Sequence, residues 1–283
     1  MRDRLVDYEA EPLGPRPTIE VEGATLSIID EGNPNAGSPR LFIQGPGCEA
    51  ETIWRPLLRE LVAAGDDRQH IAFDTRGIGS SSGWPDSLEQ MADDAAAVLA
   101  SRATSPAEVV GHSLGGAVAM LLAARHPSMV RSLILMDSVP EYSEKTRSGF
   151  QWRAGQIRNV GAVATIFDIV IPRSFGTEAQ TERPEVVARF QAMLARQSPD
   201  VYSHISELAA NTNTWAAFNS LRLPTLFVSG SEDVSTSPDI MRPLAKQIGG
   251  RFVEIPNAGH NPPLEQPAYV AAAILEHSHL YSR

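Results

Sequence analysis

Short, continuous apolar runs recur along most of the chain, separated by longer stretches with apolar residues at helical spacing. A run of this kind is typical of a strand that is buried on both faces of a sheet. The runs lie at residues 40–43, 70–73, 106–110, 132–136, 224–228 and 251–255. Strands that alternate with helices in this way predict a mostly parallel sheet that is covered by helices on both faces.

The stretches between the runs predict helices with defined apolar faces. Residues 51–64 place Trp54, Leu57, Leu58, Leu61 and Val62 on one side of a helix. At the start of the next predicted helix, Ser87 and Gln90 fit a capping box, in which each side chain bonds to the other residue's backbone N–H.

The two ends of the chain follow other patterns. Residues 1–17 carry charges and prolines and are expected to form an irregular arm. Residues 18–22 alternate like an exposed strand, and residues 25–30 are its expected hairpin partner. A last helix is expected to open at Asn261, with two prolines in its first turn.

The alternation of strand and helix breaks between residues 141 and 221. This stretch has helical patterns, no clear strand, and several aromatic side chains. Catalytic residues of such sheets lie at the carboxyl ends of the strands, and the stretch begins at that edge. We therefore predict a core domain of residues 18–140 and 222–283 and a helical cap of residues 141–221. The arginine and glutamate residues of the cap are interpreted as a solvated face.

Composition and charge narrow the range of partners. The chain has 34 acidic and 24 basic residues and a formal net charge of −10, which argues against a nucleic-acid backbone or an anionic membrane as partner. A single cysteine, Cys48, excludes an internal disulfide framework. Residues 1–17 lack an apolar core of signal-peptide length, and no stretch approaches the length of a membrane span. The simplest interpretation is a cytoplasmic enzyme that acts on a small-molecule substrate.

Residues 109–116 hold the strongest chemical signal, a Gly-x-Ser-x-Gly motif. A short β-branched run enters the motif at Gly111, and a helical pattern leaves it after Gly115. This arrangement is typical of a nucleophile elbow, in which the serine sits on a strained turn between a strand and a helix. The flanking glycines are needed because side chains would collide with the turned backbone. The helix N-terminus favours negative charge that develops at Ser113.

Four further motifs accompany the elbow, one before it in the chain and three after it. They are Asp74-x-Arg76-Gly77-x-Gly79-x-Ser81, Gly230-Ser231-Glu232-Asp233, Gly259-His260-Asn261-Pro262 and Glu265-Gln266-Pro267. With them, the chain resembles an α/β-hydrolase of the group that cleaves esters, lactones and carbon–carbon bonds, over about residues 20–140 and 222–280. The resemblance implies the α/β-hydrolase fold, with a mostly parallel eight-stranded sheet, flanking helices and a helical cap insertion.

The resemblance implies Ser113, Asp233 and His260 as the catalytic residues. A serine is a weak nucleophile until a base takes its proton, and His260, in a loop after a strand, is the expected base. Asp233 would hold the imidazole tautomer and stabilise the imidazolium. Asp137, which follows the strand after the elbow, is the alternative acid. His112 is interpreted as a packing or supporting residue.

The expected oxyanion hole departs from the family pattern. One backbone N–H should come from Leu114, directly after the nucleophile. The family usually has His-Gly in the loop after residues 40–43, whereas this chain has Gln44-Gly45-Pro46. Direct replacement would make Pro46 the second donor, and proline has no N–H. Alignment with the Gly-Pro-Gly of carbon–carbon bond hydrolases makes Gln44 the donor instead, with Gly45 and Gly47 as alternatives.

Two other features near these motifs have structural interpretations. Asp74 and Arg76 are expected to form an internal ion pair that shapes the entrance beside the elbow. Cys48 is expected to be a small buried side chain, although its loop could line the pocket.

The sequence therefore predicts a serine hydrolase that acts on a small or medium apolar ester or lactone through an acyl-enzyme. No cofactor and no metal are expected, because no nucleotide or metal motif occurs. One alternative is a hydrolase of vinylogous diketones, which cleaves a carbon–carbon bond. The other is a ligand receptor that keeps the triad and works by binding and cap movement.

Overall fold

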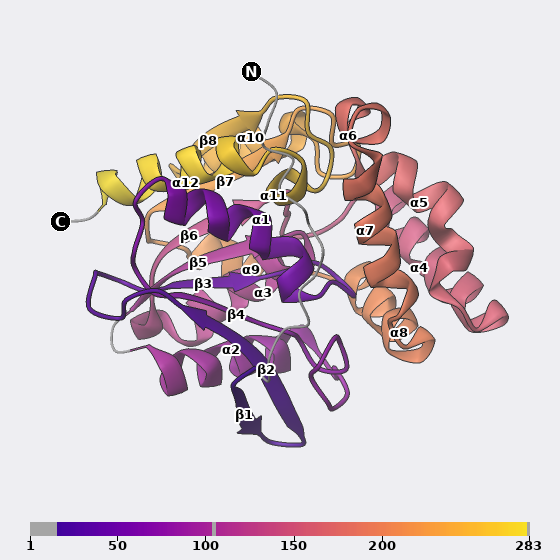
Figure 1. Cartoon of the computed structure of the whole chain (residues 1–283), viewed down its shortest axis with the longest axis horizontal. Helices are drawn as coiled ribbons and strands as arrows, with labels where there is room; N and C mark the ends of the chain where they lie inside the picture. The colour runs from indigo at the N-terminus through magenta and orange to yellow at the C-terminus, as the bar shows by residue number, and fades with distance from the viewer. Residues whose placement is uncertain (1–15, 104–105, 282–283) are drawn as a thin grey trace.

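The computed structural model describes residues 16–103 and 106–281 (Figure 1). Within them, eight strands form one sheet in the order β1-β2-β4-β3-β5-β6-β7-β8. They are β1 (Thr18–Val21), β2 (Ala24–Glu31), β3 (Arg40–Ile43), β4 (His70–Phe73), β5 (Ala107–His112), β6 (Val130–Met136), β7 (Thr225–Gly230) and β8 (Arg251–Ile255). The pairs β1–β2 and β2–β4 are antiparallel, and all other pairs are parallel. The predicted mostly parallel, eight-stranded sheet is thus confirmed. Most of the expected N-terminal arm lies outside the described residues.

Helices cover both faces of the sheet, which explains why its central strands are mostly apolar. Every residue of β3, β4, β5 and β7 is buried. On one face, α2 (Leu88–Arg102), α3 (Leu114–Arg125) and α10 (Pro238–Gln247) pack into one core. On the other, α1 (Ala50–Ala63), α11 (Pro262–Glu265) and α12 (Pro267–Leu280) form a second. Among the described residues, no helix is both long and apolar enough to cross a membrane.

Two side chains at the ends of helices differ from the predicted pattern. Val62, expected on the buried face of α1, is 59% exposed, because it lies a full 100° step beyond Leu61 at the edge of the stripe. The Ser87 hydroxyl accepts the N–H of Gln90 as expected. The Gln90 amide, however, bonds to the backbone and the carboxylate of Asp86, and these two contacts hold it one residue before the expected partner.

The predicted last helix is two helices. It opens after Asn261 as expected, but α11 ends at Glu265 and α12 begins at Pro267. Gln266 between them has φ −139° and ψ 56°. Proline disfavours the helical conformation in the residue before it and has no N–H to continue the hydrogen-bond ladder, so the chain must break there.

Residues 141–221, the predicted cap, contain helices and no strand. The helices are α4 (Glu144–Val160), α5 (Phe167–Ser174), α6 (Thr177–Thr181), α7 (Pro184–Ala195), α8 (Pro199–Ala210) and α9 (Trp215–Ser220), with a 3-10 turn at Val163–Ile166. Figure 1 shows α4 to α8 together at one side of the molecule, beyond the ends of the parallel strands. The last helix, α9, packs back against α3, and its Phe218 is fully buried in the core of that face.

Candidate active site

The turn between β5 and α3 holds Ser113 in a conformation that residues with side chains rarely adopt. Its φ is 54° and its ψ is −124°. A Cβ on Gly111 would lie 2.5 Å from the carbonyl oxygen of Gly115, and a Cβ on Gly115 would lie 2.1 Å from that of Ile43. These close approaches require both glycines of the motif. Because α3 begins directly after Ser113, the positive end of its dipole lies at the serine.

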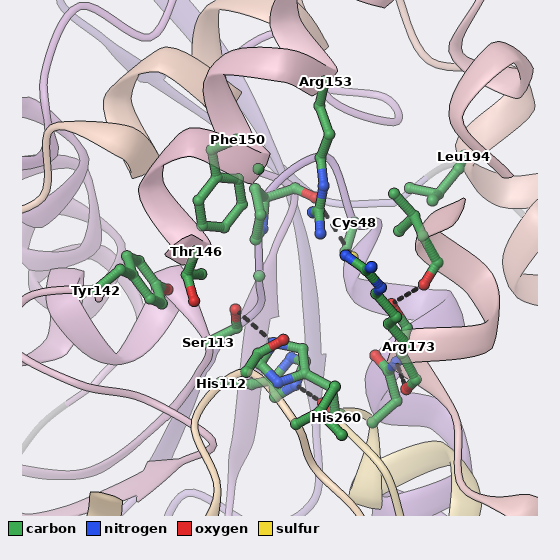
Figure 2. A pocket seen from close by; sticks show the side chains of 18 of the residues that line it. Cys48, His112, Ser113, Tyr142, Thr146, Phe150, Arg153, Arg173, Leu194 and His260 are labelled. Atoms are coloured by element: carbon green, nitrogen blue, oxygen red, sulfur yellow. Dashed lines mark hydrogen bonds between the residues drawn. The ribbon is translucent and has the colours of Figure 1, made fainter. Parts of the chain in front are cut away.

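Ser113, His260 and Asp233 form a continuous line of hydrogen bonds. The Nε2 atom of His260 lies 2.9 Å from the Oγ of Ser113, and its Nδ1 lies 2.8 Å from the Oδ2 of Asp233. The three residues follow β5, β8 and β7, so they meet at the carboxyl edge of the parallel strands. Figure 2 shows the Ser113 and His260 side chains pointing toward one another.

The contacts of Asp233 set its charge and the tautomer of His260. Burial raises the pKa of this carboxyl, but the His260 imidazole and the Thr236 hydroxyl outweigh it and hold the pKa below its ordinary value. The Thr236 hydroxyl donates to Asp233 at 2.6 Å, and the Ser235 N–H donates at 2.7 Å. An ionised Asp233 only accepts, so Nδ1 of His260 carries the proton. Nε2 is then free to accept the Ser113 hydroxyl proton.

Asp137, the alternative acid, is buried beside Asp233 but bonds to the backbone and not to Nδ1 of His260. Its Oδ1 accepts the N–H of Gly230 at 3.0 Å, while Nδ1 of His260 bonds to Asp233. Complete burial and the adjacent charge of Asp233 raise the pKa of Asp137 well above its ordinary value. This favours a neutral Asp137 next to an ionised Asp233.

His112 supports the loop that carries His260. Its Nε2 lies 2.7 Å from the backbone carbonyl oxygen of His260. A carbonyl only accepts, so Nε2 of His112 donates. Burial and the neighbouring His260 lower the pKa of His112 to about 3, which keeps its ring neutral.

Glu265 fixes the backbone on both sides of His260. Its carboxylate accepts the N–H groups of Gly259 at 3.0 Å and Asn261 at 3.0 Å. It also accepts the N–H of Gly176 at 2.7 Å, between α5 and α6. The motif around Glu265 therefore ties the His260 loop to the helical insertion.

The loop after β3 lies directly against Ser113 at Gly45. A Cβ on Gly45 would lie 3.2 Å from the Cβ of Ser113 and 3.6 Å from its Oγ. The Gln44 side chain is held elsewhere, because its Nε2 donates to the Phe73 carbonyl at 2.8 Å and its Oε1 accepts from Trp54 at 3.2 Å. Of the three residues predicted as candidates for the second oxyanion donor, Gly45 lines the cavity above Ser113, and Gln44 and Gly47 are not among the lining residues.

The neighbouring positions complete this loop. Pro46, which has no N–H to offer, lines the cavity next to Gly45. Gly47 has φ 71°, and a Cβ there would lie 2.2 Å from the ring of Tyr202. As the first residue of α3, Leu114 has a backbone N–H without an acceptor inside the helix.

The expected ion pair between Asp74 and Arg76 is wrong. Arg76 makes a bidentate pair with Asp94 of α2, at 2.7 and 2.8 Å. Asp74 instead accepts the backbone N–H groups of Ala50 at 2.8 Å and Ser80 at 3.1 Å. The first turn of α1 begins at Ala50, so its unpaired N–H groups and helix dipole give a carboxylate a favourable place.

A cavity of about 420 Å³ opens above Ser113 (Figure 2). Its floor comes from Gly45, Pro46, Cys48 and the residues around Ser113 and His260. Much of the remaining wall comes from residues 141–221, namely Tyr142, Ser143, Lys145, Thr146, Gly149, Phe150, Arg153, Val170, Arg173, Ser174, Phe190, Leu194 and Tyr202. Several of the insertion's aromatic side chains therefore line this cavity.

Sequence reasoning missed the polar residues of this wall, among them Tyr142, Arg153 and Arg173. Arg153 and Arg173, interpreted as part of a solvated face, line the cavity. The Tyr142 hydroxyl is buried close to Ser113, and burial raises its pKa to about 12, so it stays protonated as a donor. In sequence, α4 is polar and carries several arginines, so no local signal separates its cavity side from its solvent side.

Cys48 is buried as expected and also lines the cavity. It is 4% exposed. Burial, with a smaller contribution from Glu49, raises the pKa of the thiol, which therefore stays protonated.

Among the described residues, one group of acidic and histidine side chains is compact enough to hold a metal ion. It consists of Asp137, Asp233 and His260, whose polar atoms lie within 4.8 Å of one another. The hydrogen bond between Asp233 and His260 and the neutral form of Asp137 already account for this cluster, so we assign no ion to it.

Comparison with known proteins places this geometry in a family. The model of the alpha/beta hydrolase fold matches residues 42–267. BpoC of Mycobacterium tuberculosis, provisionally named as a non-heme bromoperoxidase, is 30% identical over 269 residues, which cover 89% of this chain and 96% of BpoC. 3-Oxoadipate enol-lactonase 2 of Acinetobacter baylyi is 27% identical over 199 residues, or 70% of this chain and 73% of that protein. The structure of a thermophilic esterase from Thermogutta terrifontis superposes with a TM-score of 0.84 at 27% identity, covering 94% of this chain and 100% of the esterase.

The fold and these comparisons define a hydrolase enzyme. More specifically, the chain belongs to the α/β-hydrolase fold family, as its sequence motifs predicted.

Proposed function

We propose that the protein is a serine hydrolase that cleaves a small to medium carboxylic ester or lactone through Ser113, His260 and Asp233. The observation that carries the proposal is the line of hydrogen bonds from Asp233 through His260 to Ser113, at 2.8 and 2.9 Å, opening on a cavity of about 420 Å³. The names of two similar proteins, an esterase and an enol-lactonase, support the same substrate class.

The proposed reaction has two halves. Ser113 Oγ attacks the carbonyl carbon while Nε2 of His260 takes its proton, and the carbonyl oxygen becomes an oxyanion. His260 then gives that proton to the leaving alkoxide, which departs as an alcohol or, in a lactone, stays attached to the acyl group. Water, deprotonated by His260, attacks the acyl-enzyme and releases the carboxylic acid and free Ser113.

The oxyanion requires donors that are already in place. We assign the first to the backbone N–H of Leu114 at the start of α3. For the second, Gly45 has the more favourable position, because it lies beside Ser113 and lines the cavity. Gln44 remains the other candidate of this loop.

We further propose that residues 141–221 act as a cap on a core of residues 18–140 and 222–283. The support is that α4, α5, α7 and α8 supply much of the cavity wall, while Ser113, Asp233 and His260 lie in the turn and loops that follow strands of the sheet. Substrate range is then set by the insertion and chemistry by the core.

Labelling and turnover together test this function. A fluorophosphonate probe should modify Ser113, located by mass spectrometry, and p-nitrophenyl esters and lactones should be hydrolysed over many turnovers. Ser113→Ala should lose labelling and at least about 10³-fold in kcat, since removing a triad nucleophile costs more than that elsewhere. Ser138→Ala, a buried serine packed against Gly116, is the matched control and should keep its activity. Full activity of the Ser113→Ala variant would refute the mechanism.

Cleavage of a carbon–carbon bond is the second candidate. The observation that favours it is the presence of cationic cap side chains in the cavity, because such chemistry needs polar groups that handle a dienolate. A vinylogous diketone in the same assay distinguishes the two: faster cleavage of the diketone than of any ester or lactone would favour the second candidate.

A further inference from the structure

We propose that the substrate carries an ionised carboxylate in addition to its ester or lactone group, and that Arg153 and Arg173 bind this carboxylate. The inference rests on the proposed function and specifies its substrate class. It requires that the cavity be cationic where it faces Ser113 and that its arginines be available to a ligand.

The first requirement is met by the composition of the wall. Among the described residues that line the cavity, Lys145, Arg153 and Arg173 are cationic and none is an aspartate or glutamate. The chain as a whole has ten more acidic than basic residues (34 against 24). A wall with three cations and no acid is therefore the reverse of the overall charge balance.

The second requirement is met by the partners of the arginines. Within the described part of the chain, neither Arg153 nor Arg173 forms an ion pair with an acidic side chain. Two other arginines of α4 do, because Arg147 pairs with Glu141 and Arg158 pairs with Glu207. Among the described residues, Arg153, which lines the cavity, is thus the α4 arginine that has no acidic partner.

The Arg153 guanidinium contacts uncharged groups, which position it without neutralising its charge. Its guanidinium carbon lies 4.8 Å from the centroid of the Phe150 ring. Burial lowers the pKa of Arg153, the neighbouring hydroxyls of Tyr202 and Tyr142 partly offset this effect, and repulsion by Arg173 adds to it. The two tyrosine hydroxyls are neutral partners and leave the charge of the guanidinium unpaired. Figure 2 shows both side chains reaching into the cavity from the insertion, on the opposite side of Ser113 from Tyr142. An anion between the two guanidinium groups would relieve their mutual repulsion.

The shape of the site favours a carboxylate at the end of a short carbon chain. A planar guanidinium matches a carboxylate in two parallel hydrogen bonds. The wall around the arginines includes the apolar side chains of Phe150, Val170 and Leu194, which suit methylene groups. A dicarboxylic acid esterified at one end would place its ester carbon at Ser113 and its free carboxylate at the arginines.

Two matched esters test the inference by activity. The substrates are the p-nitrophenyl monoester of adipate, which carries a carboxylate, and p-nitrophenyl hexanoate, which has the same chain length without it. We expect kcat/KM to be at least about tenfold higher for the adipate ester, as one charge-assisted pair can provide. In Arg153→Met and Arg173→Met, this preference should fall at least about tenfold, mainly through KM. Arg153→Lys, which keeps the charge but not the planar fork, should recover part of it.

The control variant removes an arginine from the same helix without touching the cavity. Arg158→Met changes the net charge by the same amount as Arg153→Met but acts on the exposed pair with Glu207. Its preference for the adipate ester should equal that of the unaltered enzyme. Equal losses in Arg158→Met and Arg153→Met would reduce the effect to overall charge and overturn the inference.

Binding to an inactive variant separates the inference from the proposed function. Calorimetric titration of Ser113→Ala with adipate should show saturable binding that Arg153→Met abolishes, while adipamide and inorganic phosphate bind at least about tenfold more weakly. Hydrolysis of the hexanoate ester with no adipate preference and no adipate binding would overturn the inference and leave the proposed function intact. Adipate binding without hydrolysis of any ester would uphold the anion site and reject the proposed function. Tighter binding of phosphate than of adipate would assign the arginines to a phosphorylated ligand and overturn the carboxylate.

Discussion

Asp233 and Asp137 lie close together near His260, yet their surroundings shift the two carboxyl pKa values in opposite directions. Asp233 accepts from His260, Thr236 and Ser235, and these contacts hold its pKa low against the effect of burial. Asp137 has one backbone donor, complete burial and the charge of Asp233 next to it, and its pKa is raised. The sequence offers both residues at strand ends. Only their hydrogen-bond partners separate Asp233, the acid of the proposed triad, from its neighbour Asp137.

This difference predicts opposite responses to the same substitution. Asp233→Asn should lower kcat by about 10⁴-fold, because an amide no longer holds the reactive tautomer of His260. Asp137→Asn should lower kcat by less than about tenfold, because an amide resembles the neutral carboxyl that the site already favours. Steady-state rates of both variants on one p-nitrophenyl ester measure the difference. If Asp137→Asn were the more damaged enzyme, the acid of the triad would have to be reassigned to Asp137.

At the scale of elements, β3 is anchored by a buried charge at the end of the strand opposite to the site. Arg40 is fully buried and donates to Glu108 at 2.7 Å, to Asp66 at 2.7 Å and to Ser278 at 3.1 Å. These contacts join β3 to β5, to the loop before β4 and to α12. A buried cation of this kind is stable only with its partners in place.

Removing this cation should destabilise the fold strongly. Arg40→Met leaves the buried Glu108 without its paired cation and leaves Asp66 with Arg68 alone, and should lower the free energy of unfolding by about 3–5 kcal/mol. Urea denaturation with a fixed m-value measures the loss. Arg242→Met, in which the lost pair with Glu254 is exposed, should cost less than about 1 kcal/mol. Similar losses in the two variants would contradict the assignment of Arg40 as a structural anchor.

At the scale of the whole molecule, buried histidines make stability depend on pH. Burial, with repulsion by Arg40, lowers the pKa of His70 to about 4 from an ordinary value of 6.5. Between these two values the unfolded chain binds a proton at His70 that the folded protein does not. Stability contributed by the neutral ring is therefore complete above pH 6.5 and falls as the pH drops toward 4.

A single variant isolates this effect from that of other titrating groups. The stability difference between the unaltered protein and His70→Gln should shrink by up to about 3 kcal/mol between pH 7 and pH 4, since each unit of pKa shift corresponds to about 1.4 kcal/mol. His279→Gln, at an exposed position on α12, supplies the control curve for a histidine that is not buried. Urea unfolding at several pH values gives all three curves, and a constant difference for His70→Gln would contradict a depressed pKa.

What the sequence could predict depends on how local each signal is. The apolar runs predicted the strands because burial on both faces favours apolar residues at most positions of a central strand. The glycines around Ser113 predicted the elbow because the turn itself requires them. The partner of Arg76 was predicted wrongly because Asp94 lies 18 residues away on another element, while Asp74 is near in sequence only. Arg153 and Arg173 were missed because their position at the cavity also depends on distant parts of the chain. A helix that covers a cavity and one that faces water can carry the same polar residues.

The single cysteine of the sequence, Cys48, can report how often the cavity wall around it fluctuates. Cys48 lies in the wall of the cavity, almost fully covered and with a raised pKa, so a maleimide in solution reacts with it only when a local fluctuation exposes the sulfur. When the return to the buried state is faster than alkylation, the observed rate is the rate of a free thiol multiplied by the fraction of time that the thiol is exposed. With no competing cysteine in the sequence, one mass-spectrometric time course yields that fraction.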